Sequence, residues 1–160
     1  MDQHNKVLIA LRRLIRATDL YSKHLSKTTG LTTPQLLILQ NLLAQGEATV
    51  SELAKAINLS QATVTTILDR LVKKEFIVRE RSTEDRRKVI TRLTEQGQEA
   101  IKDTPTALQE NFIQQFSALE DWEQTMILSS LQRLATMMDA ENLDAAPILD
   151  VGTLDRTLGN

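Results

Sequence analysis

The side chains in this sequence that could do chemistry are suited to binding an anionic partner. Small hydroxyl and amide side chains recur at helical spacing within residues 60–74, and the run 86–88 is Arg-Arg-Lys. Such groups donate hydrogen bonds and ion pairs to a polyanion. The sequence offers no acid/base pair, no nucleophile with its base, no Gly-rich phosphate loop and no metal-ligand set. Since it also has no Cys and only two His, we expect neither an enzyme, a cofactor nor a metal centre.

The formal net charge of −2 hides an asymmetry along the 160 residues. Residues 1–92 carry 16 Lys and Arg against 9 Asp and Glu, a net +7, whereas residues 93–160 carry 3 against 12, a net −9. A basic portion followed by an acidic one favours a polyanion-binding face kept apart from a solvating or partner-binding region. The alternative is ordinary variation of charge along a helical protein.

Neither a membrane span nor a secretion signal is expected. No apolar run approaches the roughly 20 residues that a spanning helix needs, and no signal-peptide pattern precedes the first charges. We therefore expect a cytoplasmic protein with no membrane partner.

The elements that must position these side chains are mostly helical, as few Gly and Pro suggest. A first helix is predicted over 2–28 and ends at Gly30, which adopts the left-handed conformation at low cost. A central helix is predicted to start with Thr33 as N-cap and Pro34 at its first position. It is apolar nearly all round, so it should be buried, and Gly46 ends it.

Two short helices with a tight connection follow. Ser51 is the expected N-cap of the first, the chain turns at Asn58-Leu59, and Ser60 caps the second, over 61–74. The expected buried positions are Leu53, Ala54, Ile57, Val64, Ile67, Leu68 and Leu71. The opposite side of the second helix carries Ala62, Thr65, Thr66, Asp69 and Lys73, with Thr63 and Arg70 at its edge. A merely solvated helix normally uses Glu and Lys, so this face indicates binding; the alternative is an ordinary surface helix.

The pattern then changes to two β-prone runs, 76–81 and 88–93, joined by a charged hairpin loop. After them, Thr94 is expected to cap a helix that Gly97 weakens and that Pro105 bends or restarts. A last helix is predicted over 118–140 from the capping-box spacing of Ser117 and Glu120. The acidic end of the chain, 141–160, has no predicted role.

Helix, tight turn, helix and charged hairpin together make a winged helix-turn-helix, so the predicted fold is mainly α with a two-stranded β-wing. A helix fits the major groove of DNA, and its outward side chains can reach base edges and phosphates. A narrow minor groove attracts an inserted Arg. The expected DNA-binding residues are Ser60, Gln61, Thr63, Thr65, Thr66, Arg70, Asp85, Arg86, Arg87 and Lys88. Asp85 is placed to pair with and orient Arg87.

Three segments resemble the MarR family of winged-helix transcriptional regulators. Leu31-Thr32-Thr33-Pro34-Gln35 is similar to the family's LTxxQ entry into the central helix, and Val50-Ser51-Glu52-Leu53-Ala54 to its first helix-turn-helix element. The run from Asp85 to Gly97, DRRKVITRLTEQG, resembles the wing signature. The resemblance covers roughly residues 5–140. The stretch 8–25 further resembles regulators of compatible-solute (ectoine) synthesis.

The resemblance implies a homodimer that binds a pseudo-palindromic operator as a repressor, with half-sites roughly 34 Å apart. The implied organisation is a dimerisation helix (1–30), a DNA-binding domain (31–97), dimerisation helices (98–140) and an acidic tail (141–160). The residues expected at the dimer interface are Leu8, Leu11, Ile15, Phe112, Phe116, Ile127, Leu131 and Leu134. The alternative for each of these is a place in the intrachain core.

Two further expectations follow from the resemblance. A small anionic or aromatic effector would bind near Arg12, Arg16, Tyr21 and His24, although such residues are also common on ordinary surfaces. A thiol-oxidation switch, which some family members use, is excluded because the chain has no Cys. The competing hypothesis for the whole protein is a winged helix that contacts another protein and binds no specific DNA.

Overall fold

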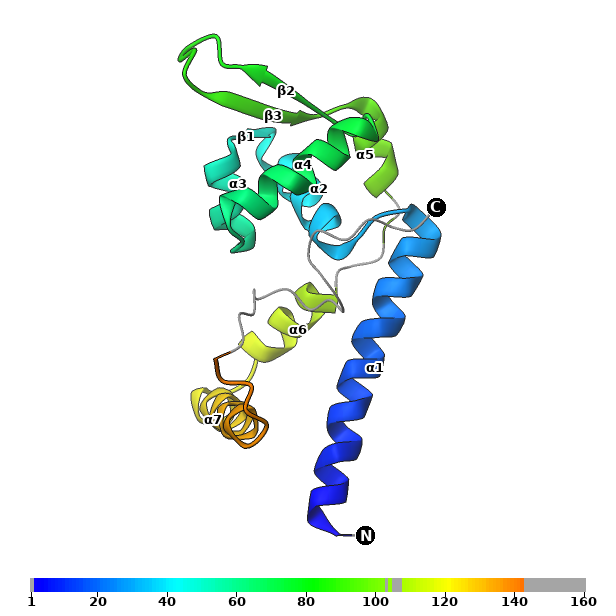
Figure 1. Ribbon diagram of the computed structural model, residues 1–160, viewed down its shortest axis with the longest axis vertical. Coiled ribbons are helices and arrows are strands. Elements are labelled where there is room, and N and C mark those ends of the chain that lie inside the picture. The colour runs from blue at the N-terminus through cyan, green and yellow to red at the C-terminus, as the bar shows by residue number, and fades with distance from the viewer. Residues whose placement is uncertain (1, 103, 105–107, 143–160) are drawn as a thin grey trace.

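The computed structural model describes residues 2–102, 104 and 108–142. Its helices are α1 Gln3–Thr29, α2 Thr33–Gln45, α3 Val50–Ile57, α4 Gln61–Lys73, α5 Glu95–Ile101, α6 Leu108–Ser117 and α7 Asp121–Met137. Its strands are β1 Glu47–Ala48, β2 Ile77–Arg81 and β3 Val89–Leu93. The segments α2–α5 and the strands form one body, from which α1 extends, while α6 and α7 lie to one side of α1 (Figure 1). Within these residues no helix is long and apolar enough to cross a membrane.

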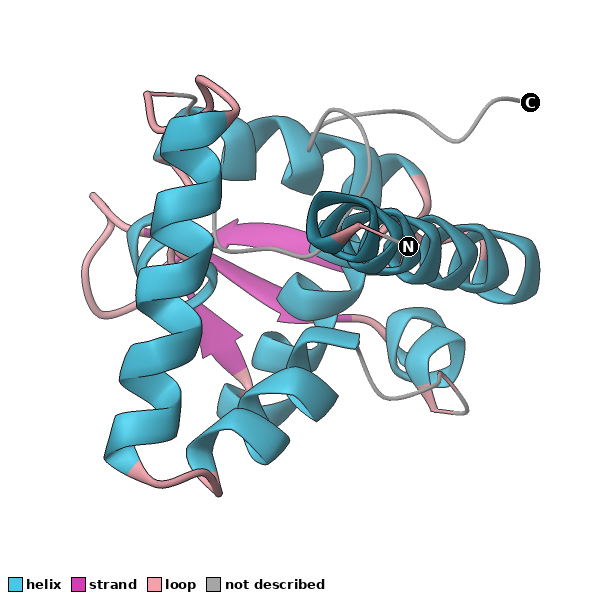
Figure 2. Ribbon diagram, turned by 90° about the horizontal axis from the view of Figure 1, so that it is seen from below, coloured by secondary structure: helices cyan, strands magenta, loops and turns pink. Residues whose placement is uncertain are grey.

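The strands form a three-stranded antiparallel sheet in the order β1-β3-β2, seen from below in Figure 2. The β2–β3 hairpin matches the two runs that the sequence predicts. The third strand, β1, was not expected, because two residues are too few for an alternating pattern. It pairs Glu47 with Arg92 and Ala48 with Thr91, which attaches the base of the wing to the chain just before α3.

The core is centred on α2, as its apolar composition predicted. Leu36, Ile38 and Leu39 on this helix are fully buried. The apolar sides expected for α3 and α4 are confirmed, since Leu53, Ala54, Ile57, Val64, Ile67, Leu68 and Leu71 are all buried. With these sides committed to the core, the remaining side of α4 must face outward.

The cap of α2 differs from the prediction by one residue. Thr32, and not Thr33, is the N-cap: its Oγ1 accepts from the Gln35 amide at 3.4 Å, and Gln35 Oε1 accepts from the Thr32 amide at 3.1 Å. Thr33 cannot form such a reciprocal pair, because the residue three positions on is Leu36. Pro34 is therefore the second helical residue, where a missing N–H is still harmless.

Two other predicted N-caps were wrong for the same reason. Thr49, and not Ser51, caps α3, because Glu52 three residues later closes the reciprocal pair. The last helix starts after Glu120, whose amide donates to Glu123 Oε2 at 3.0 Å, whereas Ser117 ends α6. The predicted stops are confirmed: Gly30 and Asn58 are left-handed and Gly46 ends α2. Pro105 and the chain from 143 onward lie outside the described residues.

Gly97 has a role opposite to the predicted weakening of α5. A Cβ at this position would lie 2.0 Å from the Phe76 carbonyl oxygen. Thr94 holds the same junction, since its Oγ1 accepts from the Gly97 amide at 3.0 Å and donates to the Glu75 carbonyl at 2.6 Å. The absence of a side chain at Gly97 thus allows α5 to pack directly on the chain that enters β2.

We predict that Gly97→Ala destabilises the protein by several kcal/mol, because the methyl group meets backbone that cannot yield without moving β2. Thermal unfolding followed by circular dichroism measures this. Gln98→Ala, an exposed position on the same helix, is the matched control and should leave the melting temperature unchanged. Equal melting temperatures for Gly97→Ala and the control would contradict the close packing of Gly97 on the Phe76 carbonyl.

Candidate nucleic-acid interface

The first turn of α4 is exposed and internally hydrogen-bonded. Ser60 caps the helix as predicted: its Oγ accepts from the Thr63 amide at 3.1 Å and lies 2.8 Å from Thr63 Oγ1. Gln61 is exposed, and in the described part of the chain no hydrogen bond engages its side-chain amide. Gln61 is therefore free to present both a donor and an acceptor to a partner.

Further along α4, the other predicted residues lie on the outward side or its edges. Thr65, Thr66 and Arg70 are all partly exposed. Thr66 Oγ1 donates to the Ala62 carbonyl at 3.2 Å, so its hydroxyl proton is already used. Arg70 Nη1 is buried with no hydrogen-bond partner among the described residues, which leaves a donor unsatisfied in the free protein.

The wing loop is held in one conformation by its own polar groups. Ser82 Oγ accepts from the amides of Glu84 and Asp85 at 3.2 and 3.3 Å. The Ser82 amide donates to the Lys88 carbonyl, and the Lys88 amide to the Asp85 carbonyl, each at 2.9 Å. These bonds close the loop on itself, so its tip is positioned before any partner arrives.

Asp85 contacts Arg87, which confirms the expected pairing. Asp85 Oδ1 accepts from the Arg87 amide at 3.1 Å and from Arg87 Nε at 3.3 Å. The Arg87 side chain is 92% exposed and that of Asp85 35%. Arg86 and Lys88 are also exposed. The tip therefore presents three cations to solvent with one carboxylate behind them.

Three ion pairs that the sequence did not indicate join the wing to α4, join it to β1, and link its own two strands. Arg79 on β2 lies 3.1 Å from Asp69 on α4. Arg92 on β3 contacts Glu47 on β1 at 2.6 Å and Glu80 on β2 at 3.5 Å. The bonds to Glu47 raise the pKa of Arg92. Strand register brings the two Arg92 pairs together and the packing of β2 on α4 brings Arg79 to Asp69, so no local pattern indicates them.

A hollow of about 540 Å³ separates the start of α3 from the wing. Its lining residues are Thr49, Val50, Ser51, Glu52, Arg79, Arg87, Lys88 and Val89. Within it, Glu52 Oε2 accepts from the Thr49 amide at 2.7 Å and from Thr49 Oγ1 at 2.9 Å. These bonds lower the pKa of Glu52.

The four expected effector residues do not share one pocket. Arg12 and Arg16 line a hollow on α1 to which neither Tyr21 nor His24 contributes. Tyr21 is half-buried against the core, and burial raises the pKa of its hydroxyl, whereas His24 is exposed. The sequence placed all four on one helix, but they lie on different sides of it. Among the described residues, no group of acidic or His side chains could hold a metal ion.

The expected dimerisation residues leave much apolar surface uncovered in the single chain. Leu8, Ile15, Phe112 and Leu131 are between 46% and 63% exposed, and Leu11, Phe116, Ile127 and Leu134 are partly exposed. Phe112 and Phe116 stack with ring centroids 5.3 Å apart. Trp122 and Met137 on α7 are 65% and 67% exposed and are not among the expected residues.

The helix-turn-helix α3–α4 followed by the β2–β3 hairpin defines a winged-helix protein, and comparison with known proteins agrees. The MarR family pattern matches residues 31–89. The HTH-type transcriptional regulator YpoP of Bacillus subtilis, uncharacterised in function, is 32% identical over 100 residues, which cover 62% of this chain and 71% of YpoP. The chain belongs to the MarR family. Regulators of this family are non-enzymatic transcription factors, which confirms that the chain is not an enzyme.

Solved structures show the same relationship. A MepR-like protein complexed with pseudoligands is 29% identical, with a TM-score of 0.55, over 86% of this chain and 95% of that one. BpsR of Bordetella bronchiseptica, whose DNA binding is regulated by 6-hydroxynicotinic acid, is 25% identical, with a TM-score of 0.51, over 81% and 98%. The winged-helix fold and a general role as a DNA-binding regulator are thereby supported.

We predict that Glu52 titrates below an ordinary Glu. Because its folded pKa is depressed, the contact with Thr49 stabilises the fold above the unfolded pKa and is lost as the pH falls through the folded pKa. An NMR titration of the Glu52 carboxyl carbon measures the shift. Thr49→Val, which removes the hydroxyl donor and keeps the shape, should raise the pKa part of the way back. An unshifted pKa for Glu52 in the unmodified chain would contradict the cap.

Proposed function

We propose that the chain acts as a homodimeric repressor that binds a pseudo-palindromic operator and occludes promoter DNA. One observation carries this proposal. The polar side of α4 is exposed, and the wing of the same domain presents three cations to solvent. The DNA-binding domain would be 31–97, and the dimerisation region 1–30 with 98–140. Two-fold symmetry would then place two α4 helices one helical turn apart.

In this proposal α4 enters the major groove. Gln61 pairs with adenine, and the partly exposed Arg70 contacts guanine or a phosphate. Ser60 and Thr63 meet phosphates at the helix N-terminus, while Thr65 and Thr66 offer methyl groups to thymine. Arg87 inserts into the minor groove with Asp85 holding its guanidinium, and Arg86 and Lys88 contact the backbone.

The dimer would bury the uncovered apolar surface of α1, α6 and α7. Exposed patches of this kind on a soluble chain mark contact with another protein, and a two-fold interface uses the same patch on both copies. The eight expected residues all lie on these helices.

A small anionic or aromatic effector would relieve repression. The support comes from BpsR, whose DNA binding responds to 6-hydroxynicotinic acid, and from the MepR-like protein with its pseudoligands. Arg12, Arg16, Tyr21 and His24 would then act from separate places on α1 and not as one pocket. The resemblance of 8–25 to ectoine regulators makes a compatible-solute promoter the first operator to footprint.

We predict that Arg87→Ala weakens binding to the selected operator about tenfold or more while leaving the melting temperature unchanged, since the side chain touches no core. Gel-shift titrations at two salt concentrations give the affinity and the number of phosphate contacts. Arg133→Ala on α7, equally cationic and exposed, is the control and should bind like the unmodified chain. Unchanged affinity for Arg87→Ala would remove the wing from the interface, and no salt-dependent binding at all would favour the protein-contact alternative.

We predict that Leu131→Asp yields a folded monomer, because it places a charge in the proposed interface at a side chain that is 47% exposed in the single chain. Sedimentation velocity over a range of concentrations measures the association. Ser129→Asp, on the other side of α7, is the matched control and should remain dimeric. A Leu131→Asp variant that dimerises as tightly as the control would refute this placement of the interface.

A further inference from the structure

One face of α1 is both basic and apolar and takes no part in the DNA and dimer contacts proposed above, although Arg12 and Arg16 on it are also candidate effector residues. It contains an open hollow of about 460 Å³ lined by Ile9, Arg12, Arg13, Arg16, Ala17 and Leu20. At 100° per residue the middle of this face lies roughly 140° around the helix from the stripe of Leu8, Leu11 and Ile15, and Arg12 lies at its edge, next to Leu8. A second copy that contacts the dimerisation residues would therefore leave most of this face open.

Within the described residues, the cations of this face outnumber the carboxylates that contact them. Arg12 and Arg13 form no ion pair there, and Arg16 Nη1 lies 3.2 Å from Asp19 Oδ2, which also contacts Lys23 Nζ at 3.0 Å. Leu20, which also lines the hollow, is 49% exposed. A surface with an aliphatic floor and an excess of guanidinium groups fits a partner that alternates aliphatic side chains with carboxylates.

The chain itself contains such a segment, residues 143–160. It repeats Leu followed by Asp at 143–144, 149–150 and 154–155, and Arg156 is its one cation. Three Asp would face three Arg, and the leucines would cover the hollow. A nucleic acid would also attract the arginines, but it would leave the aliphatic floor exposed to water.

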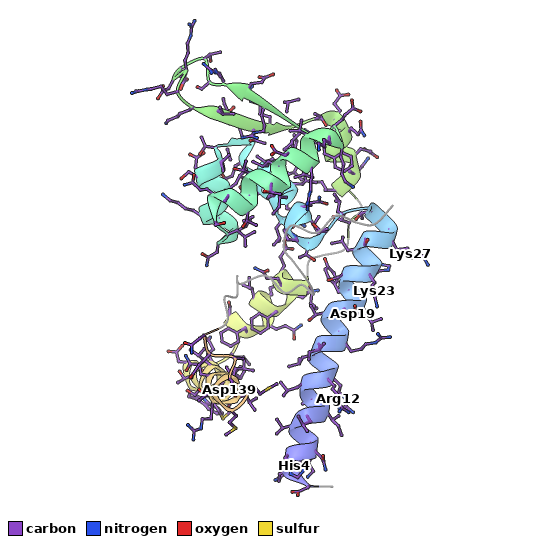
Figure 3. The ribbon with its side chains drawn as sticks, viewed as in Figure 1. His4, Arg12, Asp19, Lys23, Lys27 and Asp139 are labelled. Atoms are coloured by element: carbon purple, nitrogen blue, oxygen red, sulfur yellow. The ribbon has the colours of Figure 1, made fainter. Side chains whose placement is uncertain are left out.

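The segment is longer, when fully extended, than α1. It follows Asn142, just after α7, and in Figure 3 Asp139 lies near the level of Arg12 along the molecule's long axis. Fully extended, a segment of this length spans up to roughly 60 Å, whereas the whole of α1 is about 40 Å long.

We infer that residues 143–160 dock on the basic apolar face of α1, with their leucines in the hollow and their aspartates on Arg12, Arg13 and Arg16. The docking neutralises the cations of α1 and covers its second apolar face. It assigns a role to the acidic end of the chain that DNA binding and dimerisation do not require.

Paramagnetic NMR on the full chain tests this directly. Since the sequence has no Cys, Gly159→Cys provides a single site for a nitroxide label. The amide signals of residues 9–20 should lose intensity relative to the reduced label, while those of the wing keep theirs. Arg12→Glu with Arg13→Glu should restore the lost signals, as should higher salt, whereas Arg133→Glu, the matched control on α7, should not.

A second variant guards against an effect of the arginine substitutions on α1 itself. Asp144→Asn, Asp150→Asn and Asp155→Asn together should restore the same signals without touching α1. Undiminished signals over 9–20 in the labelled chain would overturn the inference. So would broadening centred on α4 or the wing, or broadening that survives both sets of substitutions.

Discussion

The burial of α2 is the constraint on which the rest of the structure depends. Leu36, Ile38 and Leu39 are fully enclosed, so α3, α4 and the sheet must pack around this helix. That packing uses the apolar side of α4 completely, and the side with Ala62 and Thr66 is left for a partner. The polar surface of α4 is therefore a consequence of how the core closes.

A second junction links the wing to α1. The Phe76 carbonyl accepts from the Thr94 amide at 3.1 Å and lies directly beneath Gly97. One turn away, Lys74 Nζ donates to the Gly30 carbonyl at 2.8 Å, which ties the end of α4 to the end of α1. The base of the wing, the end of α4 and the end of α1 thus meet within a few residues.

Local signals in the sequence predicted most of the elements, because helix periodicity, Gly stops and the β-prone runs act within a few residues. The predicted N-cap was wrong where two neighbouring residues could both cap a helix, as with Thr32 and Thr33. The residue that caps is the one with a Gln or Glu three positions later to complete the reciprocal hydrogen bonds. The strand β1 and the Glu47–Arg92 pair could not be predicted, because they depend on strand register. In the candidate site, the Asp85–Arg87 contact is local and was predicted. The four expected effector residues were predicted to lie together, but Tyr21 and Arg12 lie on different sides of α1.

The central proposal for the molecule is that two copies present their α4 helices and wings together to one duplex. Selection of bound duplexes from a random library, with the full chain at moderate salt, tests this most directly. The predicted result is enrichment of an inverted repeat whose half-sites are centred about 10 base pairs apart, one helical turn. Enrichment of an asymmetric or directly repeated site, or no enrichment over the starting library, would contradict it.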